Sequence, residues 1–493
     1  MAPTMLLVTL LCAAPDAPAP ISDAGDAAPT AEIASVGPSD AGVLAPQNAG
    51  FFTRFGNAYW EDWTGTLPSG PEPKYRGDPP PVSNPPFPFD YWPYGGSPTI
   101  GAPNTSWSPL MAAIYGGSGG DAWKASGVRI YGWLAAGFNV SSSRQSGFAN
   151  APAAYYAISN TVILDQLTLY IERKPDTVQT EHFDWGFRLA NLFGLDYRYT
   201  TMKGVLSNQL LVANNTYGYD PVMFYVDLYW PLLAGLNVRI GRYISLPDIE
   251  AQLAPDNYTY SHSLLYTYDC YTQLGVMATL KLDDHWLFQL GISSGNDIAF
   301  WVSNEGAQPT LTVCGSYTWQ EGKDNIYLCA NSINNGQYGY NNMQAYYATW
   351  YHKFGDGPFH MATEAWYQYQ ENVPSIFVPN NSALIPGANG AWCAAGQTKC
   401  FAPEWAITNY IELKVSDHDA LGWRNEYFDD IQGQRTGYKT QYFETLLSWV
   451  HWIGNTIIMR PEVRFEQSFA RPAYNNGTAM NQIVFATDFI FKY

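Results

Sequence analysis

Phe485-Ala-Thr-Asp-Phe-Ile-Phe-Lys-Tyr493 is the stretch of sequence that decides the fold. One parity carries Phe485, Thr487, Phe489, Phe491 and Tyr493, and the other carries Ala486, Asp488, Ile490 and Lys492. Because successive side chains of a strand point to opposite faces, the stretch predicts a strand with an aromatic face and a charged face. A soluble sheet would bury the aromatic face, whereas a barrel strand in an outer membrane turns it toward lipid. The stretch therefore predicts an all-β protein that is a transmembrane β-barrel.

The composition of the 493-residue chain agrees with this prediction. Aromatic residues make up 16% of it and charged residues only 14%, which favours strands and membrane interfaces over the charged surfaces of helices. No apolar run approaches the roughly 18 residues of a transmembrane helix. A net charge of −18 argues against nucleic acid as a partner, because phosphates need basic residues. It fits acidic loops that bind divalent cations, a lumen that favours cations, or ordinary solubility.

The first 125 residues differ from the rest of the chain. Residues 1–19 resemble a secretory signal with an apolar core, and residues 20–50 are an Ala- and Pro-rich linker expected to lack a packed core. Residues 51–125 combine Pro and Gly with aromatic residues. Since proline blocks ladder pairing, we expect an irregular periplasmic or plug segment there rather than barrel wall.

Strand-length segments with two unlike faces recur from Gly127 onward and define a barrel domain over residues 126–493. They are residues 127–138, 161–173, 184–195, 221–231, 235–243, 270–282, 286–295, 309–319, 325–331, 343–354, 359–370, 404–415, 420–429, 438–450, 456–468 and 481–493. The sequence thus predicts a single antiparallel barrel of about 16 strands, within a range of 14 to 18. The range of strand numbers reflects the 309–331 hairpin, which is either part of the wall or an extended loop.

The connections between these segments alternate in length. Short ones carry turn residues, as at 283–285 and 355–358, whereas those between them are mostly longer, as at 196–220 and 371–403. Outer-membrane barrels alternate short periplasmic turns with longer external loops. The pattern predicts that both ends of the barrel domain lie in the periplasm.

The cysteines predict two disulfides. Cys314 and Cys329 are equidistant from the turn at 321–322 and lie on the polar sides of their strands, so we expect a cross-strand disulfide in the lumen. Cys393 and Cys400 lie within one long loop, which their pairing would staple. Because Cys12 would be removed with the signal segment, Cys270 remains as a single thiol. This usage fits an oxidising compartment, and no cysteine or histidine cluster has the spacing of a zinc site.

Several segments resemble the OmpL-like β-barrel porin family of Gram-negative outer membranes over roughly residues 127–493. They are Gly241-Arg242 followed by Pro247, Glu250 and Tyr258-Thr-Tyr-Ser-His-Ser-Leu-Leu265; Arg424-Asn-Glu-Tyr-Phe-Asp429; Gly433-Gln-Arg-Thr-Gly437; and Arg460-Pro-Glu-Val-Arg-Phe-Glu466. The resemblance implies an outer-membrane channel for small solutes without enzymatic activity.

Two features are candidates for the pore. Rows of alternating Arg and Glu share one parity on two strands and must face the lumen, because an Arg at the lipid midplane costs roughly 2–4 kcal/mol. They either create a transverse field across a constriction or form a neutralised ladder that stiffens the wall. The acidic and aromatic segment 244–269 either folds into the pore, anchored by Arg242, or forms an ordinary external loop. The pore-lining candidates are Arg242, Glu250, Tyr258, Tyr260, His262, Arg424, Glu426, Asp429, Arg435, Arg460, Glu462, Arg464 and Glu466.

We therefore expect a porin-like channel for passive diffusion of small hydrophilic solutes, with no cofactor and no metal. Its partners would be outer-membrane lipid, the solutes, the barrel assembly machinery and further copies of the chain. Phe489, Phe491 and Tyr493 resemble the terminal signal that this machinery reads. A secreted or surface carbohydrate-binding protein rich in β-structure is the alternative. A barrel hydrolase is a minor one, since Gly116-Gly-Ser-Gly-Gly120 matches G-x-S-x-G without the strand and helix that a nucleophile elbow needs.

Overall fold

The structure is a computed structural model that describes residues 49–67, 74–77, 100–103, 107–246, 248–378, 384–385 and 387–493. The predicted signal segment and nearly all of the predicted linker lie outside these residues, as does Pro247. Within the described part of the chain, no helix is long and apolar enough to span a membrane.

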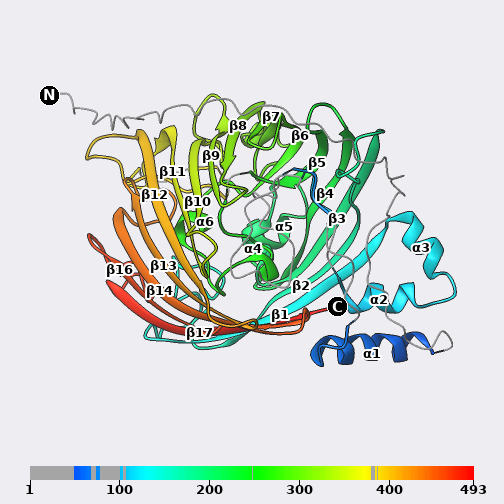
Figure 1. Cartoon of the computed structure of the whole chain (residues 1–493). Coiled ribbons are helices and arrows are strands. Elements are labelled where there is room, and N and C mark those ends of the chain that lie inside the picture. Colours follow the sequence, from blue (N-terminus) through cyan, green and yellow to red (C-terminus); the bar gives the residue numbers. More distant parts are fainter. Residues whose placement is uncertain are drawn as a thin grey trace, which may run out of the picture. The chain divides into compact units, whose positions relative to one another are not determined.

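One closed antiparallel sheet forms the body of the protein (Figure 1). Its strands are β1 (Arg129–Ser141), β2 (Val162–Arg173), β3 (Asp184–Gly194), β4 (Gly218–Trp230), β5 (Leu236–Ile244), β6 (Thr272–Lys281), β7 (Trp286–Asn296), β8 (Thr310–Trp319), β9 (Asp324–Ile333), β10 (Gln344–Lys353), β11 (Phe359–Pro374), β12 (Lys399–Lys414), β13 (Asp419–Asp430), β14 (Thr440–Ile453), β15 (Ile457–Met459), β16 (Glu462–Ser468) and β17 (Asn481–Lys492). Apart from β15 and β16, which do not pair with each other, each strand pairs with the next in sequence, and β17 pairs with β1 to close the ring.

The wall has sixteen strand positions because β15 and β16 share one. Both pair with β14 on one side and β17 on the other, and Arg460-Pro461 separates them. Proline lacks the N–H that a ladder needs, so the strand is interrupted there. The predicted all-β fold, a single antiparallel barrel of sixteen strands, is confirmed. The 309–331 hairpin is part of the wall, as β8 and β9.

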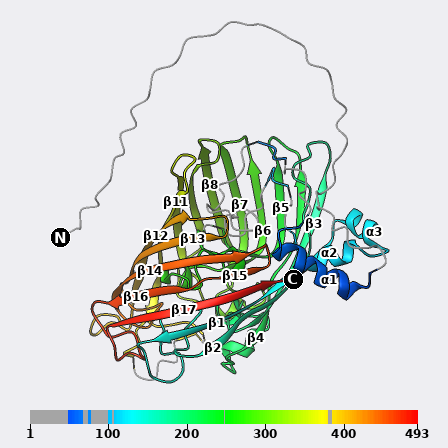
Figure 2. The same cartoon turned by 60° about the horizontal axis from the view of Figure 1, so that its bottom comes forward.

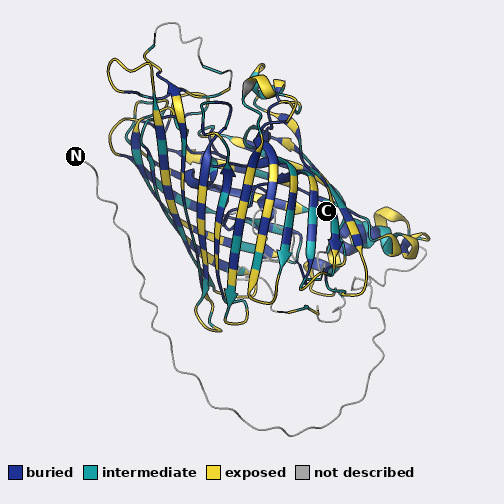
Figure 3. Ribbon diagram, turned by 90° about the horizontal axis from the view of Figure 1, so that it is seen from above, coloured by how far each residue is buried: buried dark blue, intermediate teal, exposed yellow. Residues whose placement is uncertain are grey.

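The two faces of the strands differ as the alternation predicts, and Figure 3 shows the resulting stripes of buried and exposed residues. On β7, Leu290 and Ile292 are 58% and 55% exposed on the outer face, whereas Gln289 is 2% exposed. Trp230 and Trp286 are exposed at strand ends that adjoin short turns. Aromatic residues at such ends are typical of the bands where a barrel meets the membrane interface.

The connections at the two ends of the barrel differ in length. At one end residues 142–161, 195–217, 245–271 and 375–398 connect strands, and at the other residues 231–235, 282–285, 320–323 and 354–358 do. The long connections contain the short helices α4 (Tyr197–Thr200), α5 (Asn208–Leu211) and α6 (Leu264–Thr267), and the 3-10 turns Ala254–Asp256 and Ser303–Glu305. Figure 1 shows α4 and α6 within the ring of strands.

Three helices precede the barrel: α1 (Phe51–Trp63), α2 (Pro109–Tyr115) and α3 (Gly120–Ser126). Our prediction of an irregular segment over residues 51–125 is wrong for these stretches, because it relied on composition and overlooked spacing. Phe51, Phe55, Tyr59 and Trp63 recur every four residues, and their rings contact one another along one face of α1.

Helix α1 packs against the outside of the barrel wall near the end of β17 and does not plug the lumen (Figure 2). The Tyr59 ring stacks on Phe491 with centroids 5.0 Å apart, and its hydroxyl donates to the Lys492 carbonyl at 2.9 Å. The buried Asp62 carboxylate accepts hydrogen bonds from the Asn455 backbone N–H and the Thr456 hydroxyl, both in the turn between β14 and β15.

Candidate functional site

The connection between β5 and β6, residues 245–271, lies inside the barrel and is called the inner loop below. It is buried along most of its length, so its peptide N–H and carbonyl groups need hydrogen-bond partners within the protein. Lumen-facing carboxylates of the wall accept from its N–H groups. Glu364 accepts from Ile249 at 2.8 Å, and Glu426 accepts from Leu264 at 2.8 Å and also from Leu265.

The carbonyl groups of the inner loop are bound by arginines of the wall. Arg460 donates to the carbonyls of Ala254 at 2.7 Å and Asn257 at 2.8 Å. Arg424 donates to the Ser261 carbonyl and Arg464 to the His262 carbonyl, each at 2.8 Å. The wall therefore binds both the N–H groups and the carbonyl groups of the loop backbone, so the loop is fixed by many separate hydrogen bonds.

The same three arginines, on β13, on β16 and between β15 and β16, are also paired with carboxylates. Glu444 on β14 forms ion pairs with Arg424 at 2.8 Å and with Arg464 at 2.8 Å, and Arg464 lies 2.7 Å from Glu466. Arg460 pairs with Asp488. The predicted rows of Arg and Glu therefore face inward, and Arg424 and Arg464 are completely buried.

The strand register explains how these charges are arranged. Glu426, Glu444 and Glu466 lie directly opposite one another across β13, β14 and β16. Like charges in such positions repel, but Arg424 and Arg464 flank the row one step along the strands, on either side of Leu446. The arginine row therefore offsets part of the repulsion within the carboxylate row, through the ion pairs of Glu444 and Glu466.

The candidate residues of the inner loop are all buried and bonded. The Tyr258 hydroxyl lies 2.6 Å from Nε2 of His360, and the Tyr260 hydroxyl donates to Asp165 at 3.2 Å. Glu250 accepts from the Ser263 N–H at 3.0 Å, at the start of α6, and also lies 3.9 Å from Arg424. Glu462 accepts from the Ser261 N–H at 3.2 Å.

His262 stacks on Tyr155, with ring centroids 3.7 Å apart, and its Nε2 lies 2.7 Å from the Ala251 carbonyl. Burial lowers the pKa of His262 well below its ordinary value, so this imidazole is neutral at pH 7. It therefore contributes ring stacking and a hydrogen bond to the loop rather than positive charge.

Three other candidates have different positions. Asp429 lies on the outer face of β13, with the parity of Leu421 and Trp423, so its prediction as a pore-lining residue is wrong. The motif suggested it, although the inward positions Arg424 and Glu426 already require the opposite parity for residue 429. Its neighbour Asp430 faces inward and accepts from the Thr436 N–H at 2.8 Å.

Arg242 and Arg435 form their hydrogen bonds at the end of the barrel that carries the long connections. Arg242 pairs with Asp220 at 2.9 Å and donates to the Thr200 carbonyl, so it fastens the 195–217 connection rather than the body of the inner loop. Arg435 donates to the Tyr268 carbonyl at 3.1 Å and holds the end of the inner loop.

A second group of charged and aromatic residues lines β2 to β5 and was missed by the sequence reasoning. Arg188 pairs with Glu172 at 2.6 Å, and its guanidinium lies over the rings of Tyr170 and Tyr225. Arg239 pairs with Asp227 and lies 3.9 Å from the Tyr225 ring centroid. The inward parity of these strands could have identified them, but no short motif contains them.

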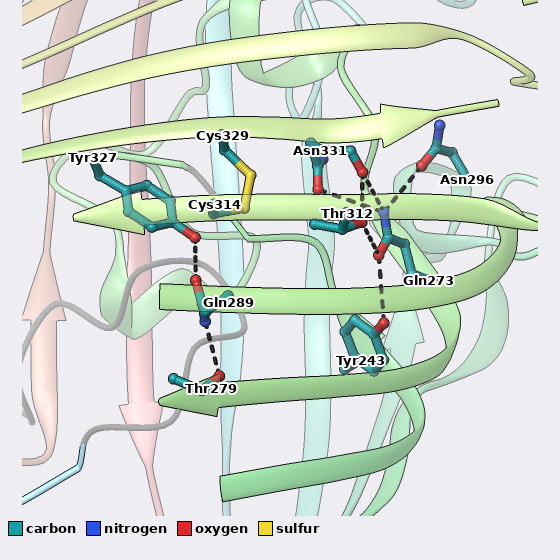
Figure 4. The surroundings of a disulfide bond; sticks show 10 residues. All are labelled: Tyr243, Gln273, Thr279, Gln289, Asn296, Thr312, Cys314, Tyr327, Cys329 and Asn331. Atoms are coloured by element: carbon teal, nitrogen blue, oxygen red, sulfur yellow. Dashed lines mark hydrogen bonds between the residues drawn. A yellow bond between two sulfur atoms is a disulfide. The ribbon is translucent and has the colours of Figure 1, made fainter. Parts of the chain in front are cut away.

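The disulfide Cys314–Cys329 joins β8 and β9 on the lumen side, and Cys393–Cys400 closes a segment within the 375–398 connection and the start of β12. Cys270 is a buried free thiol. Figure 4 shows that uncharged polar side chains surround the first disulfide. Gln273 donates to the Asn331 carbonyl at 3.1 Å, and Gln289 donates to the Thr279 hydroxyl at 3.0 Å. This part of the lumen wall is hydrophilic without being charged.

An apolar outer face, a polar inner face and a loop bound inside the ring define an outer-membrane β-barrel of the porin type. The chain belongs to the family described as "Putative beta-barrel porin-2, OmpL-like", whose profile matches residues 127–493. The family and the barrel locate the protein in the outer membrane, and the resemblance seen in the sequence is confirmed. No curated protein matches the chain.

Solved structures with a similar fold include the anion-selective porin from Comamonas acidovorans, with a TM-score of 0.48, 9% identity, and coverage of 74% of this chain and 99% of that one. OmpT of Vibrio cholerae in its trimer form has a TM-score of 0.44 and 10% identity, and the coverage is 74% and 99%. The outer membrane channel DcaP of Acinetobacter baumannii has a TM-score of 0.43 and 10% identity, with 74% and 97% covered.

Proposed function

We propose that the protein is a channel for passive diffusion of small hydrophilic solutes, in which the inner loop sets the narrowest zone. The observation that carries the proposal is the bonding of this loop inside a ring whose inward side chains are polar. A water-filled passage needs such a wall, and an inserted segment restricts what can pass. The Gly116–Gly120 string runs from the end of α2 to the first residue of α3 and has no strand before it, which supports a channel over a hydrolase.

The charge of the narrow zone supports a preference for cations. Three buried arginines line the β13–β17 wall, Arg424, Arg460 and Arg464, together with six buried carboxylates, Glu426, Asp430, Glu444, Glu462, Glu466 and Asp488. Each arginine is paired, which favours the neutralised ladder over a free transverse field. The bias then comes from the excess of carboxylates and from the acidic inner loop.

The position of the helices supports a periplasmic location for both ends of the barrel domain, because short connections are typical of the periplasmic side. Helix α1 packs beside one of these short turns, at residues 454–456. In this arrangement lipid covers the apolar outer face. Three further points remain predictions: that the assembly machinery is a partner, that it reads a signal at Phe489, Phe491 and Tyr493, and that copies of the chain associate.

Single-channel recording in planar bilayers tests the proposal. Purified full-length protein should give discrete conductance steps, and a salt gradient should give a reversal potential of the sign expected for cations. A folded barrel that inserts but does not conduct would refute a channel, and specific retention on immobilised sugars would then favour the carbohydrate-binding alternative.

A variant at Glu426 tests the role of the inner loop. In Glu426→Gln, one of the two oxygens that accept from Leu264 and Leu265 is replaced by an amide donor, so we expect a larger or noisier open-channel current. The matched control is Glu412→Gln, a buried lumen carboxylate of β12 that accepts no hydrogen bond within the described part of the chain. Equal currents from both variants would contradict a constricting role for the loop.

A further inference from the structure

Three buried carboxylates meet where the inner loop joins the wall. Asp248 and Asp269 lie near the two ends of the loop, and Glu364 projects inward from β11. One oxygen of each lies within 4.8 Å of the others, and the residues are 3%, 4% and 0% exposed. The chain therefore concentrates negative charge at a point shielded from water.

The protein leaves part of this charge uncompensated. Oε2 of Glu364 accepts from the Ile249 N–H, but Oε1 of Glu364 and Oδ2 of Asp269 have no hydrogen-bond partner among the described residues. Neither Asp269 nor Glu364 forms an ion pair with a lysine or arginine in that part of the chain. A buried carboxylate without a partner is costly, so the arrangement needs a cation or added protons.

The surroundings of the cluster contain further unused oxygen. The buried hydroxyl of Tyr266, in α6, has no hydrogen bond within the described residues and lies within the electrostatic influence of Asp248 and Asp269.

We propose that Asp248, Asp269 and Glu364 bind a divalent cation of the calcium type. The donors are all oxygen, which selects hard cations over zinc or copper. Ca²⁺ accepts irregular arrangements of carboxylate and carbonyl oxygens, whereas Mg²⁺ demands near-octahedral geometry and retains its waters. A dry cluster supplied by a loop and a strand suits Ca²⁺ better.

The site would act on the inner loop as a clamp. Because its ligands come from both ends of the loop and from β11, a bound cation closes the loop at its base and fixes it to the wall. The site does not depend on whether the barrel conducts, since binding can be measured on the folded protein alone.

The test is calcium titration of the full-length protein in detergent after extraction with EGTA, by calorimetry and by terbium luminescence. We expect ~1 Ca²⁺ per chain bound inside the barrel and sensitised terbium emission, because Trp366 donates to the Leu265 carbonyl nearby. Glu364→Gln and Asp269→Asn should each weaken binding by about 10-fold or more.

Glu412→Gln is the control, because it removes a buried lumen carboxylate outside the cluster and should bind calcium as the wild type does. Heat-modified migration on gels identifies variants that fail to fold, and either ligand variant suffices for the comparison. Absence of calcium binding by the folded wild type, or unchanged binding by a folded ligand variant, would overturn the proposal. Either result would leave the channel measurements standing.

Discussion

Glu444 pairs with two arginines at once, and this sharing makes the charged wall sensitive to single changes. It lies 2.8 Å from Arg424 and 2.8 Å from Arg464, and all three side chains are buried. Removing one partner from a buried ion pair leaves a charge that neither water nor protein compensates. The inner loop is affected as well, because both arginines donate to its carbonyls.

Replacement of Arg464 by methionine tests this at the level of one residue. Glu444 and Glu466 would lose a buried partner, so Arg464→Met should lower the free energy of unfolding by about 3–5 kcal/mol. Urea titration of the barrel in liposomes, followed by tryptophan fluorescence, measures the change. Lys323→Met is the control, since Lys323 pairs with Asp356 in an exposed turn and should leave stability unchanged. Similar unfolding curves for both variants would contradict the role given to Arg464.

Sequence reasoning located individual lumen residues where parity was clear. Alternation alone placed Arg460, Glu462, Arg464 and Glu466 on the inner face, and the same rule would have excluded Asp429. It could not find the carboxylate cluster, and we expected no metal site. Asp269 and Glu364 are far apart in sequence and meet only because the inner loop folds back against β11.

Among the elements, the strands were more predictable than the helices. The strand segments follow from two-residue alternation, and even the break in the 456–468 segment is marked by Pro461. Helix α1 lies in a region rich in proline and glycine, where the four-residue spacing of Phe51, Phe55 and Tyr59 was overlooked. The sequence suggested that the inner loop enters the barrel but could not predict its path, because that path depends on hydrogen bonds from several strands at once.

The docking of α1 gives a prediction at this scale. Asp62→Ala removes the acceptor of the Asn455 N–H and Thr456 hydroxyl bonds, so α1 should leave the wall more often. Trypsin should then cut after Arg54 faster than in the wild type, as followed by N-terminal sequencing. Glu61→Ala on the same helix is the control and should be cut at the wild-type rate. No acceleration in Asp62→Ala would contradict a docking role for Asp62.

At the scale of the whole molecule, the barrel depends on the difference in polarity between the two faces of its wall. Apolar side chains such as Phe485 and Phe489 cover the outside at 60% and 49% exposure, and polar side chains fill the inside. The order and closure of the strands follow from this difference in polarity together with the alternation of short and long connections. The filling of the lumen does not, because alternation specifies which face a residue occupies but not which residues meet across the ring.

A labelling scan along β17 tests the two-faced wall most directly. Single cysteines at Ile483, Phe485 and Phe489, and at Val484, Ala486 and Ile490, would carry a nitroxide in protein reconstituted in liposomes. Collision rates with dissolved oxygen should alternate with a period of two, high at the odd positions in contact with hydrocarbon and low at the even ones. Uniform rates along the strand, or odd positions reached mainly by a water-soluble nickel reagent, would contradict the two-faced wall.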